Sequence, residues 1–506
     1  MLGDGSARFC VWAPEREEVE LELDGRSYRL NRGVDGVQAI TVPAQVGARY
    51  QFYLDEAGPY PDPCSRSQPD GVTSASELID TSVFASRIAA WRPPVLEELV
   101  IYELHVGAFT QPGTFDAIAN RLGALRNLGV RAIEVMPIAT FVGQRGWGYD
   151  GLYTSAPYAP YGGPAAFARF VDAAHRADLG VIVDVVYNHL GPGSEALTAF
   201  GPYLGATETL WGRALDYRQR GVREWAIQNA EMWVRDYSVD GLRIDAAHAI
   251  VDDSDPHVLK ELATRVHDLD PMVLVISEMA AGDLRPITEW GHDAQWADEL
   301  HHAVHSVLTG EREGYYKDYG SLRDIASALE RTERERLVVC AQDHDQVGNR
   351  AFGDRLHGIK LRLAAFCVLT SASTPLLFMG EEYDEVHPFL FFTDHTDPAL
   401  AEATRDGRRR EFADFVAFSG KEIPDPQAEE TFLASKLEPD NGDAATRAYY
   451  RDLLLLRARL KGRPVSVSLD EERSLIRVRR GDIELVMNFS DEVTDGVLPW
   501  SGAWYE

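Results

Sequence analysis

Cysteines are few in this sequence, and long apolar runs are absent. Its 506 residues contain four cysteines, and no two of them have the CxxC spacing typical of zinc sites and redox disulfides. We therefore expect all four to be small buried side chains in a reducing compartment. No uncharged stretch of 18 or more apolar residues occurs, so no transmembrane helix is predicted. The cysteines are Cys10, Cys64, Cys340 and Cys367.

Positive charge is scarce as well. Acidic residues outnumber lysines and arginines 80 to 50, which gives a formal net charge of -30. Such a field repels phosphate backbones and anionic lipid surfaces, so we expect neither a nucleic-acid nor a membrane partner. The first thirty residues show no basic segment followed by an apolar one, as a secretory signal would, and we expect a cytoplasmic protein. The oligomeric state does not follow from the sequence.

The two ends of the chain have the patterning of β-structure. The composition, 45% hydrophobic and 26% charged, is typical of a globular protein, and the length fits about three domains. Residues 1–90 alternate apolar and polar positions between Gly, Asp and Pro turns, which predicts a small antiparallel β-sandwich of the carbohydrate-binding kind. Residues 463–506 return to short strands and predict a small C-terminal β-domain.

The middle of the chain, residues 95–462, alternates apolar strand candidates with amphipathic helix candidates. Eight such units predict parallel pairing and closure into a (β/α)8 TIM barrel. The long intervals after 189 and after 382 exceed a simple loop and are candidates for insertions that shape a substrate site. The helix candidates include 114–129 and 447–462. The strand candidates lie in 99–106, 132–138, 181–189, 241–248, 273–279, 293–300, 338–345 and 375–382.

Three of these strand segments end in an acid: Asp245, Glu278 and Asp345. The carboxyl ends of the strands of a barrel converge on one face, where active sites are built. A glycosidase needs one carboxylic acid to protonate the leaving oxygen and one carboxylate at the sugar carbon. The three acids therefore indicate cleavage of a glycosidic bond. A single acid at a strand end could equally cap the following helix.

Four segments together resemble the signature regions of glycoside hydrolase family 13, the α-amylase superfamily. The resemblance implies that Asp245 is the nucleophile, Glu278 the general acid and then base, and Asp345 the acid that binds sugar hydroxyls. It also implies a retaining mechanism, in which the two reacting carboxyl groups lie about 5 to 5.5 Å apart. The four segments are Asp184 to His189, Gly241 to Asp245, Glu278, and His344 with Asp345.

Other residues of these segments support the acids. Arg243 lies two residues before Asp245, on the same face of a strand, and would keep the nucleophile ionised. Asp184 would mainly orient Arg243. His189 and His344 are hydrogen-bond donors for a substrate hydroxyl. Asn188 matches a calcium ligand of many superfamily members, but six to eight oxygens cannot be assembled around it, so we predict no metal and no cofactor.

Aromatic and histidine side chains are candidates for sugar contacts, because the apolar face of a sugar ring stacks on an aromatic ring. Tyr149 resembles the superfamily's tyrosine beneath the cleaved sugar, and each of the others has packing as its alternative. A histidine cluster lacks the HExxH pattern and a third ligand, so we expect helix-face histidines or sugar contacts there rather than a metal site. The further candidates are Trp147, Tyr203, Trp211 and Trp296, and the cluster is His301, His302 and His305.

Longer strings narrow the resemblance to one branch of the family, the maltooligosyltrehalose trehalohydrolases. They include IYELHVGAFT, RGWGYDGLY and the segment 293–316. The implied reaction is hydrolysis of the α-1,4 bond next to the terminal trehalose of an α-glucan oligosaccharide. Two departures stand out: Asp343 where an Asn is expected, with its ionisation open, and MAAGDLRPI after Glu278 where a more polar loop is expected. A branching or debranching enzyme and a noncatalytic glucan-binding protein remain the alternatives.

Overall fold

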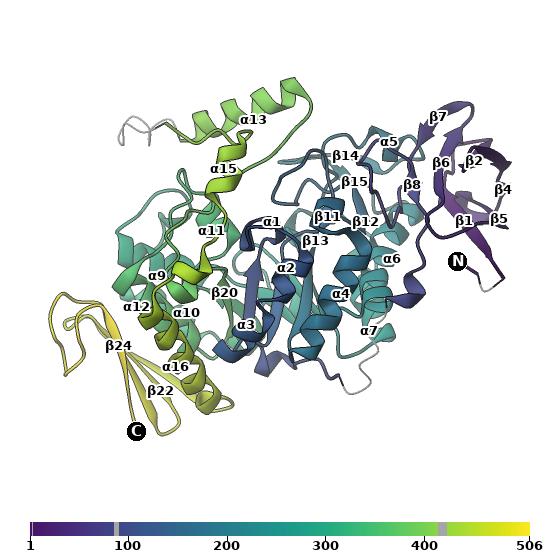
Figure 1. The fold of residues 1–506 in the computed structure, drawn as a ribbon. Coiled ribbons are helices and arrows are strands. Elements are labelled where there is room, and N and C mark those ends of the chain that lie inside the picture. Colours follow the sequence, from purple (N-terminus) through teal and green to yellow (C-terminus); the bar gives the residue numbers. More distant parts are fainter. Residues whose placement is uncertain (3, 85–90, 413–421) are drawn as a thin grey trace.

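Eight parallel strands close into a barrel at the centre of the molecule, which confirms the predicted (β/α)8 fold (Figure 1). The computed structural model describes residues 1–2, 4–84, 91–412 and 422–506. Each of the eight segments predicted from the sequence overlaps one barrel strand, and three of the strands begin one residue earlier than predicted. In chain order these are β9 (Ile101–Leu104), β10 (Ala132–Val135), β13 (Gly180–Val185), β16 (Gly241–Ile244), β17 (Leu274–Glu278), β18 (Ala294–Trp296), β19 (Leu337–Cys340) and β20 (Thr374–Phe378).

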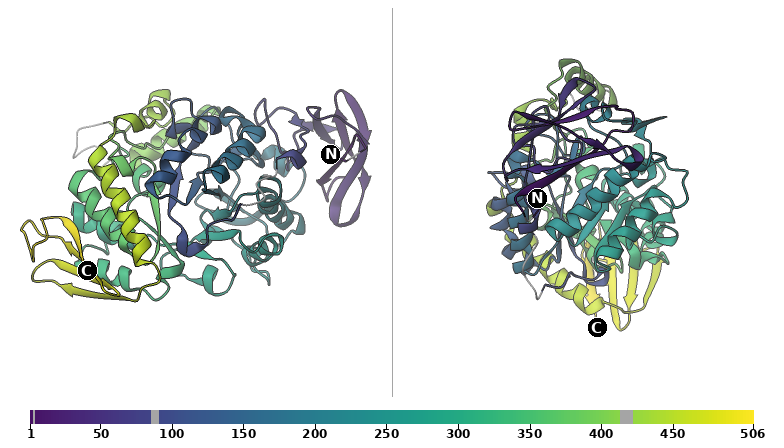
Figure 2. Two further views of the ribbon diagram at one scale, coloured as in Figure 1. Left: turned by 60° about the horizontal axis from the view of Figure 1, so that its bottom comes forward. Right: turned by 90° about the vertical axis from the view of Figure 1, so that its right-hand side faces the viewer.

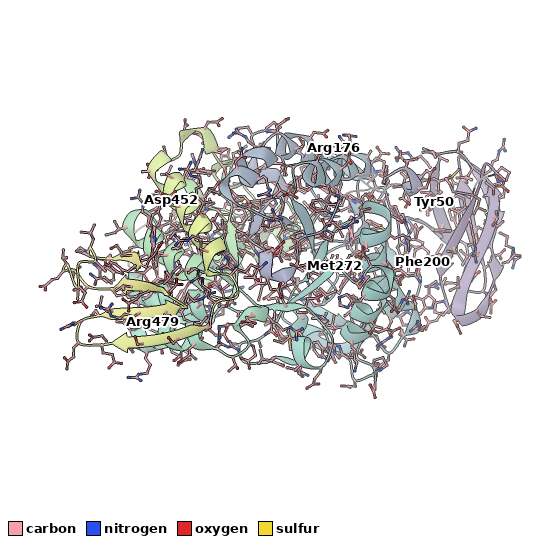
Figure 3. The ribbon with its side chains drawn as sticks, turned by 90° about the horizontal axis from the view of Figure 1, so that it is seen from below. Tyr50, Arg176, Phe200, Met272, Asp452 and Arg479 are labelled. Carbon is pink, nitrogen blue, oxygen red and sulfur yellow. The ribbon has the colours of Figure 1, made fainter. Side chains whose placement is uncertain are left out.

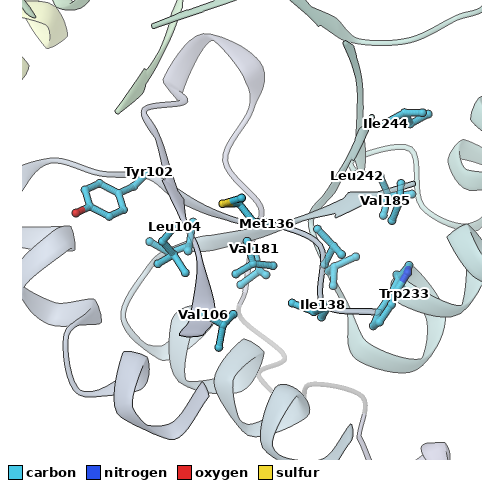
Figure 4. Packing of buried hydrophobic residues seen from close by; sticks show 14 of the residues in the cluster. Tyr102, Leu104, Val106, Met136, Ile138, Val181, Val185, Trp233, Leu242 and Ile244 are labelled. Atoms are coloured by element: carbon cyan, nitrogen blue, oxygen red, sulfur yellow. The ribbon is translucent and has the colours of Figure 1, made fainter. Parts of the chain in front are cut away.

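The barrel interior changes from apolar to polar toward the carboxyl ends of its strands. Outward-facing residues such as Val181 and Leu242 pack under the surrounding helices (Figure 4). Inside, an apolar layer with Ile101, Ala132 and Ile182 lies below. Because side chains two residues apart share a face, the next layer up is built from charged groups. That layer includes Glu103, Glu134, Asp184 and Arg243, all at most 2% exposed.

Helices surround the barrel largely as predicted, with one difference. The segment 114–129 forms two helices, α2 (Phe115–Ala119) and α3 (Leu122–Leu128), separated by a turn at Asn120 and Arg121, where the Asn120 side chain donates to the Asp116 carbonyl. The other long barrel helices are α4 (Gly163–Arg176), α6 (Arg220–Tyr237), α7 (Val258–Leu269), α9 (Glu299–Thr309), α10 (Leu322–Glu330), α12 (Gly358–Thr370) and α16 (Ala444–Leu460). No helix within the described ranges is long and apolar enough to span a bilayer.

Two antiparallel sheets make up the N-terminal module. The expectation that all cysteines are buried is wrong here, because Cys10 and Cys64 are exposed. In β1, Phe9 and Val11 face the core, so Cys10 between them points outward. The predicted domain boundary at 90 lies in 85–90, outside the described residues. The sheets are β1 (Ser6–Trp12), β5 (Val37–Pro43) and β4 (Asn31–Arg32), and β3 (Arg26–Arg29), β2 (Val19–Leu23), β6 (Arg49–Leu54), β7 (Ala57–Tyr60) and β8 (Ser76–Glu77).

This module contacts the barrel through the insertion that follows β13. Phe52 packs edge-on against Phe200 with ring centroids 6.0 Å apart, and the Arg16 guanidinium donates to the Ala199 carbonyl at 2.6 Å. Figure 3 shows Phe200 where the two parts meet. Four residues further on, a hairpin of β14 (Leu204–Thr209) and β15 (Gly212–Leu215) begins. The sandwich therefore braces the base of this hairpin.

The C-terminal module lies on the side of the barrel opposite the N-terminal module (Figures 1 and 2). It is one four-stranded antiparallel sheet that packs on α12, where Gly502 lies so close to Phe366 that a Cβ atom would come within 2.3 Å of the ring. The long interval after β20 contains α13 (Pro398–Glu411) and α15 (Glu429–Ala434). The strands of the sheet are β21 (Val465–Asp470), β22 (Leu475–Arg480), β23 (Ile483–Asn488) and β24 (Ser501–Tyr505).

Candidate active site

The three predicted acids lie together at the carboxyl ends of neighbouring strands. Asp245 follows the last residue of β16, and Glu278 is the last residue of β17. Asp345 lies beyond the end of β19, in the short helix α11 (His344–Gly348). Its carboxyl group accepts a hydrogen bond from the Asn349 side chain at 2.9 Å and is the most exposed of the three. The topology of the barrel thus brings together residues that are 100 positions apart.

Arg243 connects two of these acids. Its side chain is fully buried, and its Nη1 donates to Asp245 Oδ1 at 2.8 Å while Nη2 donates to Glu278 Oε2 at 2.6 Å. Nη1 also donates to Asp184 Oδ2 at 2.7 Å, which is the predicted contact between these two residues. The Trp296 ring packs against the guanidinium, with its centroid 4.3 Å from the central carbon. One cation therefore neutralises part of the charge of three carboxylates.

The two carboxyl groups bound by Arg243 differ in acidity. Burial raises the pKa of Asp245 well above its usual range, although Arg243 opposes the shift. Burial acts in the same direction on Glu278, but Arg243 and the Ala246 N–H, which donates to Oε2 at 3.0 Å, outweigh it and lower that pKa. Ala246 has the left-handed φ of 40° that directs its amide at Glu278. Burial therefore dominates at Asp245, whereas hydrogen bonds and a nearby cation dominate at Glu278.

His344 forms the other half of the site. Its Nδ1 donates to Glu103 Oε1 at 2.5 Å, and its Nε2 lies 3.4 Å from Asp345 Oδ2. Burial works to lower the pKa of His344, but the two carboxylates raise it well above its usual value, so the ring is an imidazolium. Tyr149 stacks on this ring at 5.0 Å between centroids and donates its hydroxyl to Asp184 at 2.7 Å. Tyr149, His344 and Asp345 thus form one continuous wall.

The remaining predicted substrate contacts divide into a stacked pair, Trp211 and His189, and two residues whose polar atoms bond to the protein, Trp147 and His301. Trp211, 43% exposed in the turn of the β14–β15 hairpin, stacks on His189 with ring centroids 5.6 Å apart. Burial lowers the pKa of His189 to about 4, so this histidine is neutral. Trp147 is buried behind His344, donates its Nε1 to the Leu390 carbonyl and stacks on a phenylalanine. His301 is also buried, and both its ring nitrogens bond to protein groups, the Ala341 carbonyl and the Tyr316 hydroxyl.

The predicted histidine cluster lies on a single helix, α9. His301, His302 and His305 follow one another on α9, and His305 Nε2 lies 3.0 Å from Glu311 Oε2. Within the described residues, no group of three or more His, Cys, Asp and Glu side chains is arranged to hold a metal ion. Tyr203 and Trp296 are buried in packing contacts.

Comparison with known proteins agrees with this geometry. The model of the α-amylase catalytic domain matches residues 60–200. A malto-oligosyltrehalose trehalohydrolase of Deinococcus radiodurans is 42% identical over 90% of this chain and 81% of its own length. One of Mycobacterium tuberculosis is 39% identical over 98% and 94%. The chain belongs to the malto-oligosyltrehalose trehalohydrolase family.

Solved structures of other proteins share the fold of this chain. A crystal structure described as a putative α-amylase from Salmonella typhimurium is 35% identical, with a TM-score of 0.88 over 96% of this chain and 92% of that one. A pullulanase from Anoxybacillus, solved with maltotetraose, is 18% identical with a TM-score of 0.75 over 97% of this chain and 81% of that one, and shares the fold.

Two residues of this trehalohydrolase family member that the sequence analysis missed lie beneath the site. Glu103 holds His344 with both oxygens, since Oε2 accepts from the His344 amide at 3.0 Å. Glu134 lies beside Glu103 in the strand register, yet neither of its oxygens has a partner among the described residues. Burial raises its pKa well above the usual range, so it is a neutral acid. In the sequence, the only sign of either residue is a single acid inside an apolar run, Glu103 in IYEL and Glu134 in AIEV.

The departure at Asp343 also has a structural explanation. Its Oδ1 accepts from the Gln346 amide at 2.7 Å and thereby caps α11, a role that an Asn side chain can also fill. Burial and the nearby Glu103 carboxylate raise the pKa of Asp343 to about 7. Its ionisation, left open by the sequence, therefore changes near neutral pH.

Proposed function

We propose that the protein is a retaining glycoside hydrolase that cleaves the α-1,4-glucosidic bond next to the terminal trehalose of maltooligosyltrehalose, releasing trehalose and a maltooligosaccharide. The observation that carries this proposal is identity of about two residues in five with malto-oligosyltrehalose trehalohydrolases along 90% to 98% of the chain. An alignment over that share of the chain covers most of the loops between the barrel strands as well as the strands that carry the acids.

Three acids have the roles of such a mechanism. Asp245 attacks the sugar carbon and forms a glycosyl ester, while Glu278 gives its proton to the departing oxygen. Glu278 then takes a proton from water, which cleaves the ester with overall retention. One guanidinium bonds both carboxyl groups, so they lie side by side, and the retaining mechanism predicts that they are about 5 to 5.5 Å apart. Asp345 binds sugar hydroxyls as charge develops on the ring.

The two roles require different protonation states. The attacking carboxyl group has to be ionised, and the general acid has to carry a proton. The Arg243 guanidinium bonds Asp245 Oδ1 and so favours the ionised form that attacks.

The side chains around the acids fit the proposed substrate. Tyr149 and the imidazolium of His344 would lie beneath the sugar that is cleaved, and the exposed Trp211, backed by His189, would stack on a neighbouring sugar. Arg243 would affect the substrate indirectly, through its hydrogen bonds to Asp245 and Glu278. Trp147 and His301 have their polar atoms occupied by the protein, so we assign them support of the walls.

Product analysis tests the proposal. The purified protein is incubated with maltooligosyltrehalose, and the sugars are followed by NMR, which also reports the anomer formed first. We expect free trehalose and a maltooligosaccharide released as its α-anomer. Absence of trehalose would overturn the proposal. Transfer to α-1,6 branches instead would favour the branching-enzyme alternative. A 1,4-α-glucan branching enzyme of Ralstonia nicotianae is 32% identical over 48% of the chain.

A further inference from the structure

A cavity of about 850 Å³ lies at the base of the barrel, opposite the acids. It is lined by Val100, directly before β9, and Thr374, the first residue of β20, together with residues 451–460 of α16 and Arg480 at the end of β22. Its volume is within the range of sites for small organic ligands, roughly 300 to 1,000 Å³. The cavity therefore touches three parts of the fold that are distant in sequence.

The walls of this base cavity are basic although the protein as a whole is acidic. Seven of the lining residues are Lys or Arg, and three are Glu. Five of these seven cations have a carboxylate partner: Lys461 pairs with Glu98 at 3.1 Å, Arg126 and Arg131 share Asp178, Arg463 pairs with Asp482, and Arg451 lies 3.9 Å from Asp452. Among the described residues, the uncompensated positive charge of the wall is therefore that of Arg457 and Arg480, and such a local field attracts an anion.

Two arginines in the wall have no carboxylate partner among the described residues. Arg457 donates only to main-chain carbonyls, those of Leu369, Ser371 and Ser373. Arg480 is 4% exposed, donates to the carbonyls of Thr370 and Leu460, and leaves its buried Nε without a partner. The proximity of these cations adds to burial and lowers the pKa of Arg457 to about 9.

Carbonyl contacts account for part of this arrangement, because Arg480 caps the carboxyl ends of α12 and α16. A helix end supplies only about half a negative charge, whereas each guanidinium carries a full positive one. An unpaired buried charge is costly, and a planar guanidinium matches the oxygens of a phosphate group. We propose that the base cavity binds a phosphorylated small molecule of sugar size, with its phosphate at Arg457 and Arg480.

The apolar part of the wall sets the size of the ligand. Val100, Leu454 and Leu460 line the cavity beside the arginines. An inorganic phosphate would leave most of the volume unfilled, while a hexose phosphate would reach both the cations and the apolar side. The bound group would join the C-terminal sheet to the barrel, so we expect binding to stabilise the fold.

The test uses the full chain, with glucose 6-phosphate, inorganic phosphate and glucose as probes in calorimetry and thermal unfolding. We expect one saturable site for glucose 6-phosphate with a raised Tm, weaker binding of phosphate, and no base-cavity binding of glucose. Changing Arg480 risks the two helix ends, so the site variant is Ala458→Glu, which adds a carboxylate to the cavity wall and leaves both caps intact. Its dissociation constant for glucose 6-phosphate should rise at least tenfold.

The matched control is Ala445→Glu, the same change at an exposed position of α16 that does not line the cavity. It should bind glucose 6-phosphate like the parent protein. The proposal is overturned if glucose 6-phosphate and phosphate both fail to bind at tens of millimolar, or if Ala458→Glu binds them as the parent does. Equal binding of glucose and glucose 6-phosphate would also contradict it, because the phosphate would then contribute nothing.

Discussion

Arginines at the two ends of the barrel have different surroundings. At the carboxyl end, Arg243 bonds Asp184, Asp245 and Glu278. At the amino end, Arg457 and Arg480 bond only carbonyls. The first cation is held by charges that must change during a reaction, and the others by fixed dipoles of the fold. Substitutions at the two ends should therefore be separable into effects on rate and effects on stability.

The largest expected effect is at the carboxyl end. Asp245→Asn removes the proposed nucleophile and should lower kcat by about 10⁴-fold or more, measured by trehalose release. The fold should persist, with a normal circular dichroism spectrum. Asp253→Asn, the same change at an exposed position eight residues on, is the control and should retain full activity. Turnover by Asp245→Asn near the parent rate would sink the assignment.

Glu103→Gln tests whether the buried layer acts on the site through His344. Losing the carboxylate partner should make the imidazolium less stable, lower kcat/KM by roughly 10- to 100-fold, and move the alkaline limb of the pH profile to lower pH. Glu134→Gln is the matched control, because this neighbouring acid is neutral and bonds no described group. Its pH profile should stay unchanged. Equal profiles for the two variants would mean that Glu103 only fills space.

The pH dependence of stability should reveal Asp343. Its pKa is raised from 3.8 to about 7 in the folded protein, so folding favours the protonated form. The associated stability is present below about pH 4 and is lost as the pH rises toward 7, on the order of a few kcal/mol in total. Asp343→Asn keeps the helix cap and should flatten the fall in Tm between pH 4 and 8. An unchanged slope would exclude Asp343 as its source.

The smallest effect belongs to the amino end and should leave the rate alone. Gly502→Ala would push a Cβ atom into the Phe366 ring and loosen the C-terminal sheet, at a cost of about 1 to 3 kcal/mol. Urea unfolding measures the loss, and kcat/KM of the folded protein should equal that of the parent. Gly123→Ala, where a Cβ meets open space on α3, should cost nothing. A fall in kcat/KM for Gly502→Ala would show that the two ends are coupled.

Sequence patterns predicted the barrel strands because each is a short apolar run that alternates with amphipathic helix candidates. They also predicted that Asp245, Glu278 and Asp345 follow such runs. Periodicity could not show the turn at Asn120, because the apolar positions keep a helical spacing across it. Nor could it show that Glu103 holds His344, 241 positions away, because that contact exists only once the barrel closes. The same holds for the partners of His301, which come from two other elements.

The N-terminal module contributes to the active site without supplying a residue to the acids. By packing on Phe200 and bonding the Ala199 carbonyl, it fixes the start of the segment that carries Trp211 over His189. Deleting this module would leave the strands that carry the three acids in place, and would remove the contacts to Phe200 and Ala199 at the start of the segment that leads to Trp211. A minimal version of the enzyme should therefore retain the N-terminal module together with the barrel.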